Sequence, residues 1–146
     1  MGITAENLAV KYGISREDCD NYALLSQSRT AAAKAAGAFK DEIAPLTVST
    51  KKGDIVFAED EHPRRETSME SLAGLKVLHP EIEGFSVTAG NSSGTNDAAA
   101  VVALAAPDTQ QPVLASILSW SQVGVPPKRT GSGPIYAIPK ALDLAG

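Results

Sequence analysis

The residues best suited to contact a ligand lie in a run of small and polar side chains between Thr88 and Asp97. Gly90 and Gly94 carry no side-chain bulk, so backbone amides and neighbouring hydroxyl groups can approach a bound group closely. The run contains neither the Gly-Lys-Ser/Thr of a phosphate-binding P-loop nor the Gly-x-Gly-x-x-Gly of a dinucleotide site. The same composition is typical of a tight turn. Composition alone leaves a ligand-binding loop and a plain turn both open.

Other chemically capable side chains are scattered along the chain. Arg64 and Arg65 are suited to grip a phosphate, and they also fit a solvated run of charges. His62 and His79 have no cysteine near them in sequence, so we expect no metal site. The single cysteine, Cys19, has no nearby histidine base, and we expect a structural thiol. No set of nucleophile and base emerges, so we predict no catalytic residue.

The composition excludes several classes of protein. The chain has 146 residues, and its 13 Lys+Arg against 17 Asp+Glu provide no basic surface for nucleic acid. No apolar run approaches the length of about 18 residues that a membrane helix needs, and the first residues do not resemble a secretory signal. One cysteine rules out an internal disulfide. We therefore expect a globular protein without a membrane or nucleic-acid partner, in a cytoplasmic setting.

Two helices are expected in the first part of the chain. The first has Thr4 as N-cap and continues to about Tyr12. The second begins at a capping box formed by Ser15 and Asp18 and continues to about Ala36. Its small side chains form a narrow stripe that lets another element approach closely.

The remaining elements follow from shorter patterns. The β-prone runs on either side of residues 51–54 predict a hairpin. Residues 67–70 form a second capping-box pattern, Thr67 with Glu70, which predicts a helix through about Leu75. Leu72 and Leu75 are expected to face inward. The apolar run 98–106 fits a strand or a helix, 113–125 fits a strand buried on both faces, and 135–144 is expected to be helical.

A series of motifs occurs in the order found in the middle part of thiolases. They are MGITAENLA (1–9), YGISREDCD (12–20), SQ (26–27), FKDEI (39–43), DE with a following arginine (60–64), VTAGNSSGTND (87–97), and VGVPP with GSGPI (123–135). Each motif is modest alone. Together they make the chain closely resemble an acetyl-CoA C-acyltransferase over essentially its whole length.

The resemblance implies an α/β fold of the thiolase type. In that fold two similar βαβαβαββ halves stack into five layers, and a loop domain that holds CoA is inserted in the first half. We expect residues 1–95 to form most of the loop domain, 96–111 the end of the N-terminal half, and 112–146 the start of the C-terminal half. On this mapping the run 98–106 is expected to be a strand.

The resemblance also assigns CoA contacts at the loop domain. Arg64 matches an arginine near the adenine and phosphate end of CoA, and Ser71 matches a serine that contacts CoA just inside a helix. CoA is a substrate of thiolases, so no separate cofactor and no metal are expected.

Four further residues match the part of the family's site that holds the pantetheine arm. Ser93 matches the serine that hydrogen-bonds this arm, and Ala89 and Gly94 lie beside it in the same motif. Met1 matches a methionine that contacts pantetheine. These four residues, with the two above, are the predicted CoA-binding set.

The catalytic motifs of the family have no counterpart in these 146 residues. Thiolases make or cleave 3-ketoacyl-CoA with a nucleophilic cysteine, a second cysteine and histidines. The chain lacks the family's Asn-Glu-Ala-Phe, Gly-His-Pro and Cys-Gly-Gly-Gly segments, and Cys19 stands where glutamine is common. We expect the chain to contribute CoA-binding surface to thiolase-like acyl transfer and to be inactive alone.

A second class of function is open, a non-enzymatic assembly or binding module. In that role the β-prone residues of the hairpin would pair with another chain through an open strand edge. The expected partners are CoA or acyl-CoA, together with further copies of the chain or complementing thiolase segments.

Overall fold

The computed structural model describes residues 1–146, which divide into two compact units. One unit consists of Ile14–Gly94, called here the 14–94 unit. The other, called the split unit, combines Met1–Gly13 with Thr95–Gly146. None of the helices is long and apolar enough to cross a bilayer.

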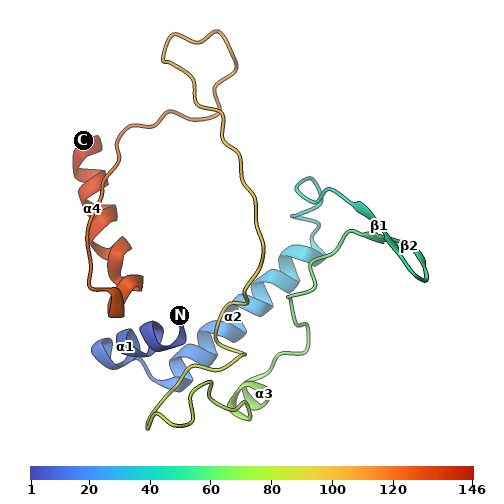
Figure 1. Ribbon diagram of the computed structural model, residues 1–146, viewed down its shortest axis with the longest axis vertical. Coiled ribbons are helices and arrows are strands. Elements are labelled where there is room, and N and C mark those ends of the chain that lie inside the picture. Colours follow the sequence, from blue (N-terminus) through green and yellow to red (C-terminus); the bar gives the residue numbers. More distant parts are fainter. The chain divides into compact units, whose positions relative to one another are not determined.

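The longest helix of the 14–94 unit is α2, Arg16–Ala35 (Figure 1). Its N-terminus carries the predicted capping box: the Ser15 hydroxyl accepts from the Asp18 backbone N–H at 3.0 Å, and Asp18 Oδ2 accepts from the Ser15 backbone N–H at 2.9 Å. These bonds satisfy amides that have no partner within the helix. The helix ends before Gly37, which has a φ of 72° that suits glycine. Both predicted ends of this helix are confirmed.

The predicted hairpin is also confirmed. Strand β1, Leu46–Thr50, pairs antiparallel with β2, Gly53–Phe57. The tight turn is possible because Gly53 adopts a φ of 112°. Every residue of both strands is exposed, so neither face of this two-stranded sheet is covered within the chain.

Helix α3, Met69–Ala73, begins one residue later than its sequence pattern predicts. The capping box uses Ser68 and Ser71 rather than Thr67 and Glu70, because Ser68 has the extended backbone of an N-cap. Leu72 faces inward as predicted and is 3% exposed. The prediction for Leu75 was wrong: it lies beyond the end of α3 and is 39% exposed.

In the split unit, α1 spans Gly2–Tyr12 and packs against the 3-10 helix η1, Pro127–Ser132. The predicted cap at Thr4 was wrong, because the helix begins before it. Thr4 lies in the first turn, where its hydroxyl donates to the Met1 carbonyl at 2.7 Å. The predicted end of the helix is confirmed, since Gly13 has a φ of 65°. A hydrogen bond links α1 to η1: Asn7 Nδ2 donates to the Lys128 carbonyl at 2.9 Å.

Helix α4, Gly133–Ala145, contains the helix predicted over 135–144. The segment before η1 runs along it. The hydroxyl of Ser119 donates to the Ala141 carbonyl at 2.5 Å, and that of Ser121 donates to the Ala137 carbonyl at 2.7 Å. These bonds tie residues 119–121 to α4.

The strands predicted at 98–106 and 113–125 are absent. Residues 96–126 contain no helix or strand, and most of their side chains are exposed, including Trp120 at 71%. A strand is defined by a neighbouring strand that pairs with its N–H and C=O groups. The only strands in the chain are β1 and β2, which pair with each other, so the apolar runs have no sheet to join.

Candidate functional site

The small-residue run starts from a buried stretch of the 14–94 unit. Phe85, Val87 and Thr88 are all buried, and Thr88 is completely so. The Leu78 N–H donates to the Val87 carbonyl at 2.9 Å, and Val77 forms an isolated antiparallel bridge with Thr88. The loop that follows, residues 89–94 and called here the 89–94 loop, is therefore anchored at its first end to the segment after α3.

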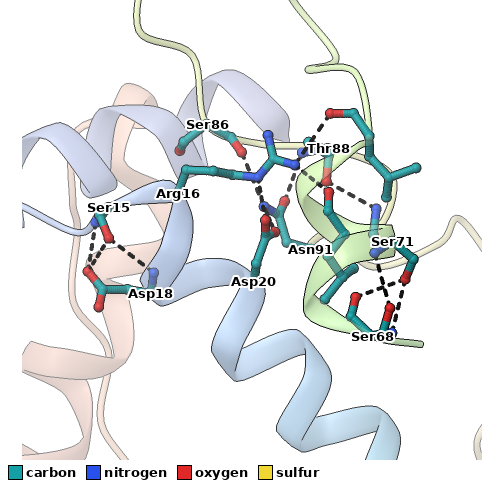
Figure 2. A network of polar contacts seen from close by, with 12 residues as sticks. Ser15, Arg16, Asp18, Asp20, Ser68, Ser71, Ser86, Thr88 and Asn91 are labelled. Atoms are coloured by element: carbon teal, nitrogen blue, oxygen red, sulfur yellow. Dashed lines mark hydrogen bonds and ion pairs between the residues drawn. The ribbon is translucent and has the colours of Figure 1, made fainter.

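Asn91 organises the loop from within. Its Oδ1 accepts from the Thr88 backbone N–H at 2.8 Å, and its Nδ2 donates to the Ser86 carbonyl at 3.1 Å (Figure 2). The Ser92 hydroxyl donates to the Thr88 carbonyl at 2.7 Å. Because a side-chain amide can both donate and accept, one residue closes the turn on two sides.

Gly90 brings the loop into direct contact with the α3 region. A Cβ at this position would lie 2.5 Å from Leu75 Cδ1 and 2.6 Å from Leu72 Cδ2. Both distances are far below van der Waals contact, so the absence of a side chain lets the backbone approach the two leucines. Here the glycine serves close packing as much as turn formation.

The predicted pantetheine contacts in the loop are open to solvent. Ala89, Ser93 and Gly94 are all exposed. The Ser93 hydroxyl makes only a long contact of 3.4 Å to the Gly94 carbonyl, a distance at which a hydrogen bond is weak. This hydroxyl can therefore donate to a ligand without breaking a strong bond.

Ser71 has a structural task in addition to any contact with a ligand. Its hydroxyl accepts from the Ser68 backbone N–H at 3.0 Å and donates to the Ser68 carbonyl at 2.8 Å. Its donor is thus already in use, and one lone pair remains for a ligand N–H or O–H. The residue lies on α3, whose Leu72 packs against Gly90 of the loop.

The backbone of Arg64 forms a hydrogen bond with α2, whereas its side chain forms no ion pair. Its N–H donates to Gln27 Oε1 of α2 at 2.8 Å, and its guanidinium is exposed. Nearby, Lys34 Nζ lies 2.7 Å from Glu59 Oε2, and this hydrogen bond is the main reason that the pKa of Glu59 is lowered. Arg65 adds a smaller effect in the same direction. Neither arginine forms an ion pair, and only Arg65 has an electrostatic effect on Glu59.

The six predicted residues thus lie in four places in the chain. Ala89, Ser93 and Gly94 share one loop, Ser71 lies on the helix that this loop touches, and Arg64 lies in the segment before that helix. Met1 belongs to the split unit, where it is exposed at the start of α1.

Two surface grooves of the split unit contain no predicted residue. An open groove of about 900 Å³ is lined by residues 121–124 and by part of α4, and a smaller one of about 320 Å³ lies between α1 and η1. No group of three or more His, Cys, Asp or Glu side chains is arranged to hold a metal ion.

Sequence reasoning missed two residues of α2: Asp20, which connects the helix to the loop, and Arg16, which connects it to the carbonyls of Leu72 and Leu75. Asp20 is 2% exposed, and its Oδ1 accepts from Asn91 Nδ2 at 2.9 Å. The available signal was the spacing of Arg16 and Asp20, four residues apart on a helix. That spacing predicts an ion pair, but not its burial.

Comparison with known proteins decides the family. The model of the thiolase N-terminal domain matches residues 1–108. The chain belongs to the thiolase family. It is 48% identical over 150 residues to the mitochondrial 3-ketoacyl-CoA thiolase of Rattus norvegicus, and 48% identical over 151 residues to an acetyl-CoA acetyltransferase of Rhizobium meliloti (strain 1021). These alignments cover 100% of the chain but 37% and 38% of the two relatives.

The fold agrees with this family. The crystal structure of the Bacillus anthracis acetyl-CoA acetyltransferase matches with a TM-score of 0.88 at 43% identity, over 99% of this chain and 37% of that one. The thiolase-like α/β fold expected from the motifs is therefore confirmed. The assignment of residues 1–95, 96–111 and 112–146 to parts of the thiolase domains stays a prediction, as do the CoA contacts.

Proposed function

We propose that this chain takes part in thiolase-type transfer of acyl groups between CoA thioesters, and that its contribution is CoA-binding surface in the 14–94 unit. The observation that carries the proposal is the 89–94 loop. It is anchored by part-buried hydrogen bonds at its first end, and it presents the exposed Ser93 hydroxyl, whose contact with the Gly94 carbonyl is long at 3.4 Å. Such a rigid base with an exposed donor suits the polar, flexible pantetheine arm of CoA. Membership of a family of acyl-CoA enzymes supports this choice of ligand.

The positive charge of Arg64 supports the proposal that this residue binds the phosphate-bearing end of CoA. An exposed guanidinium without a carboxylate partner is suited to a phosphate group, which it can bind through two parallel hydrogen bonds. CoA carries phosphates at its nucleotide end and an amide-rich arm at the other. Arg64 and Ser93 therefore offer the two kinds of recognition that CoA requires.

Titration of the 146-residue chain with CoA in a calorimeter tests the proposal. CoA should bind more weakly to Ser93→Ala, because one hydrogen bond is lost. Arg64→Ala should also bind CoA more weakly, and the loss of affinity should be larger at low salt than at high salt, because salt screens the attraction between the guanidinium and a phosphate. Ser28→Ala and Arg29→Ala are matched controls, since both residues are exposed on α2 and neither belongs to the predicted CoA-binding set. Heat of binding that is absent, or equally reduced in the controls, would refute the assignment.

Turnover is a separate question with its own assay. We propose that the 146-residue polypeptide does not cleave acetoacetyl-CoA with free CoA, because it lacks the family's catalytic cysteine and histidine motifs. Consumption of acetoacetyl-CoA above a boiled control would contradict this. Activity that appears only when the remaining thiolase segments are supplied as separate polypeptides would identify the chain as part of a split enzyme.

A second candidate function, an assembly module, is favoured by the uncovered hairpin. Cross-strand pairs point to the same face of a sheet, so the register places Leu46, Val48, Ile55 and Phe57 on one exposed apolar face. Sedimentation velocity at several concentrations tests this role. Association that weakens in Val48→Lys would support it, and a strictly monomeric chain would exclude it.

A further inference from the structure

Two polar side chains, one from the same helix and one from the 89–94 loop, donate to the buried carboxylate of Asp20. Arg16 Nε donates to Asp20 Oδ2 at 2.7 Å, and Asn91 Nδ2 donates to Asp20 Oδ1 at 2.9 Å (Figure 2). Each carboxylate oxygen therefore accepts from a different partner. We call Arg16, Asp20 and Asn91 the polar clamp.

The arginine of the clamp extends the connection to the end of α3. Its Nη2 donates to the carbonyl of Leu72 at 2.7 Å and to that of Leu75 at 3.3 Å. The Leu72 carbonyl also accepts from the Leu75 N–H at 3.0 Å, and the guanidinium uses its second lone pair. Arg16 thus holds the C-terminal end of α3, while Asp20, through Asn91, holds the loop.

The polar clamp and the apolar contact at Gly90 join the same elements. Gly90 lies against Leu72 and Leu75, whose carbonyls are the acceptors for Arg16. Side-chain packing and backbone hydrogen bonding therefore fix one arrangement of α2, α3 and the loop.

We propose that Arg16, Asp20 and Asn91 are positioning residues for CoA: they set the affinity by fixing the loop that bears Ser93 against the helix that bears Ser71. This inference rests on the proposed function, in which Ser71 and Ser93 contact CoA. At 2% exposure Asp20 acts through the loop rather than on the ligand. The apparent affinity for a ligand falls in proportion to the fraction of molecules whose site is correctly formed, and the clamp raises that fraction.

Asp20→Asn is the sharpest test of the clamp. The amide has nearly the same shape as the carboxylate but only one acceptor oxygen, so it cannot accept from both Arg16 and Asn91. The internal hydrogen bonds of the loop are left in place. We expect the dissociation constant for CoA to rise about tenfold, because hydrogen bonds to charged groups are among the stronger ones.

The second readout needs no ligand. Hydrogen exchange should accelerate about tenfold at the Thr88 and Gly90 amides, which are bonded within the loop. The Leu78 amide, bonded to the Val87 carbonyl, serves as the internal reference and should change less. A loss of protection confined to the loop shows local loosening rather than global unfolding.

Ser15→Ala is the matched control. It removes the N-cap of the same helix and lowers stability without touching the loop. At a temperature where all variants are folded, the control should bind CoA like the parent chain.

The outcomes separate this inference from the proposed function. If the parent chain binds CoA and Asp20→Asn binds it equally well, the clamp does not position the site, although the proposed function stands. A loss of CoA affinity in Ser15→Ala equal to that in Asp20→Asn overturns the inference as well, because destabilising α2 at any site would then be enough to weaken binding. If the parent chain binds no CoA, the proposed function fails, and unchanged protection of the loop amides in Asp20→Asn would overturn the clamp too.

Discussion

Replacement of Asp20 by alanine should destabilise the 14–94 unit far more than the loss of an ordinary ion pair on a helix. The pair with Arg16 has the spacing of a common surface interaction, which contributes about 0.3–0.5 kcal/mol when both groups are exposed. Here the Asp20 side chain is 3% exposed and that of Arg16 is 26% exposed. Water therefore cannot replace the carboxylate as acceptor for both partners.

The magnitude follows from the bonds that are lost. Asp20→Ala removes the acceptor for the Arg16 guanidinium and for the Asn91 amide, and hydrogen bonds to a charged group contribute about 1.5–3 kcal/mol each. Arg16 keeps two carbonyl acceptors, so the free energy lost with its bond to Asp20 lies at the lower end of that range. Alanine also has a helix propensity better than aspartate by roughly 0.7 kcal/mol. The net loss in free energy of unfolding should be about 2–4 kcal/mol.

Urea unfolding followed by circular dichroism measures this loss, because α2 dominates the helical signal of the unit. A double-mutant cycle with Arg16→Ala should give a coupling of about 1–2 kcal/mol. Asp20→Asn, which keeps one acceptor, should lose about half as much and remains measurable if Asp20→Ala does not fold. A loss below about 0.5 kcal/mol, or additive single variants, would refute the reasoning from burial.

Three further variants test other parts of the structure. Gly90→Ala should reduce the free energy of unfolding by about 1–3 kcal/mol through overpacking against the two leucines, whereas Gly124→Ala, with nothing within 4 Å of its Cβ, should be neutral or slightly stabilising in the same denaturation assay. Leu72→Ala should lower the midpoint of thermal unfolding, with a loss of about 2–5 kcal/mol, because the side chain is buried; a loss under 1 kcal/mol would contradict its place in the core. Hydrogen bonds from the Ser15 side chain and then its backbone lower the pKa of Asp18 below its ordinary value of 3.8 in the folded chain, so the carboxylate stabilises the fold above pH 3.8 and this contribution disappears as the pH falls through the lowered value. Asp18→Asn should flatten the pH dependence of stability below pH 3.8, and an unchanged profile would show that the capping box does not hold in solution.

Local signals predicted the elements of the 14–94 unit well. The capping box at Ser15, the end of α2 before Gly37 and the hairpin all depend on neighbouring residues, and all are confirmed. The error at α3 arose because two overlapping patterns fit the same stretch. Only the backbone geometry shows that Ser68, not Thr67, is the cap.

The features that sequence patterns did not predict depend on distant partners. An aspartate on a helix usually faces solvent, whereas Asp20 is buried and accepts a hydrogen bond from Asn91, 71 residues away. The strands expected at 98–106 and 113–125 fail for the opposite reason, since their apolar pattern is present but no strand in the chain pairs with them. In both cases the deciding partner lies outside any local window.

The single tryptophan, Trp120, lies in one of these unpaired stretches and is 71% exposed. An indole in water emits at longer wavelength than one in an apolar setting, so its fluorescence is a built-in optical sensor for whatever covers residues 113–125. CoA bound at the 14–94 unit should leave this emission unchanged, because that unit contains no tryptophan. Docking of complementing thiolase segments on this stretch should shift it to the blue. A blue shift would thus report a protein segment that covers residues 113–125, independently of CoA binding.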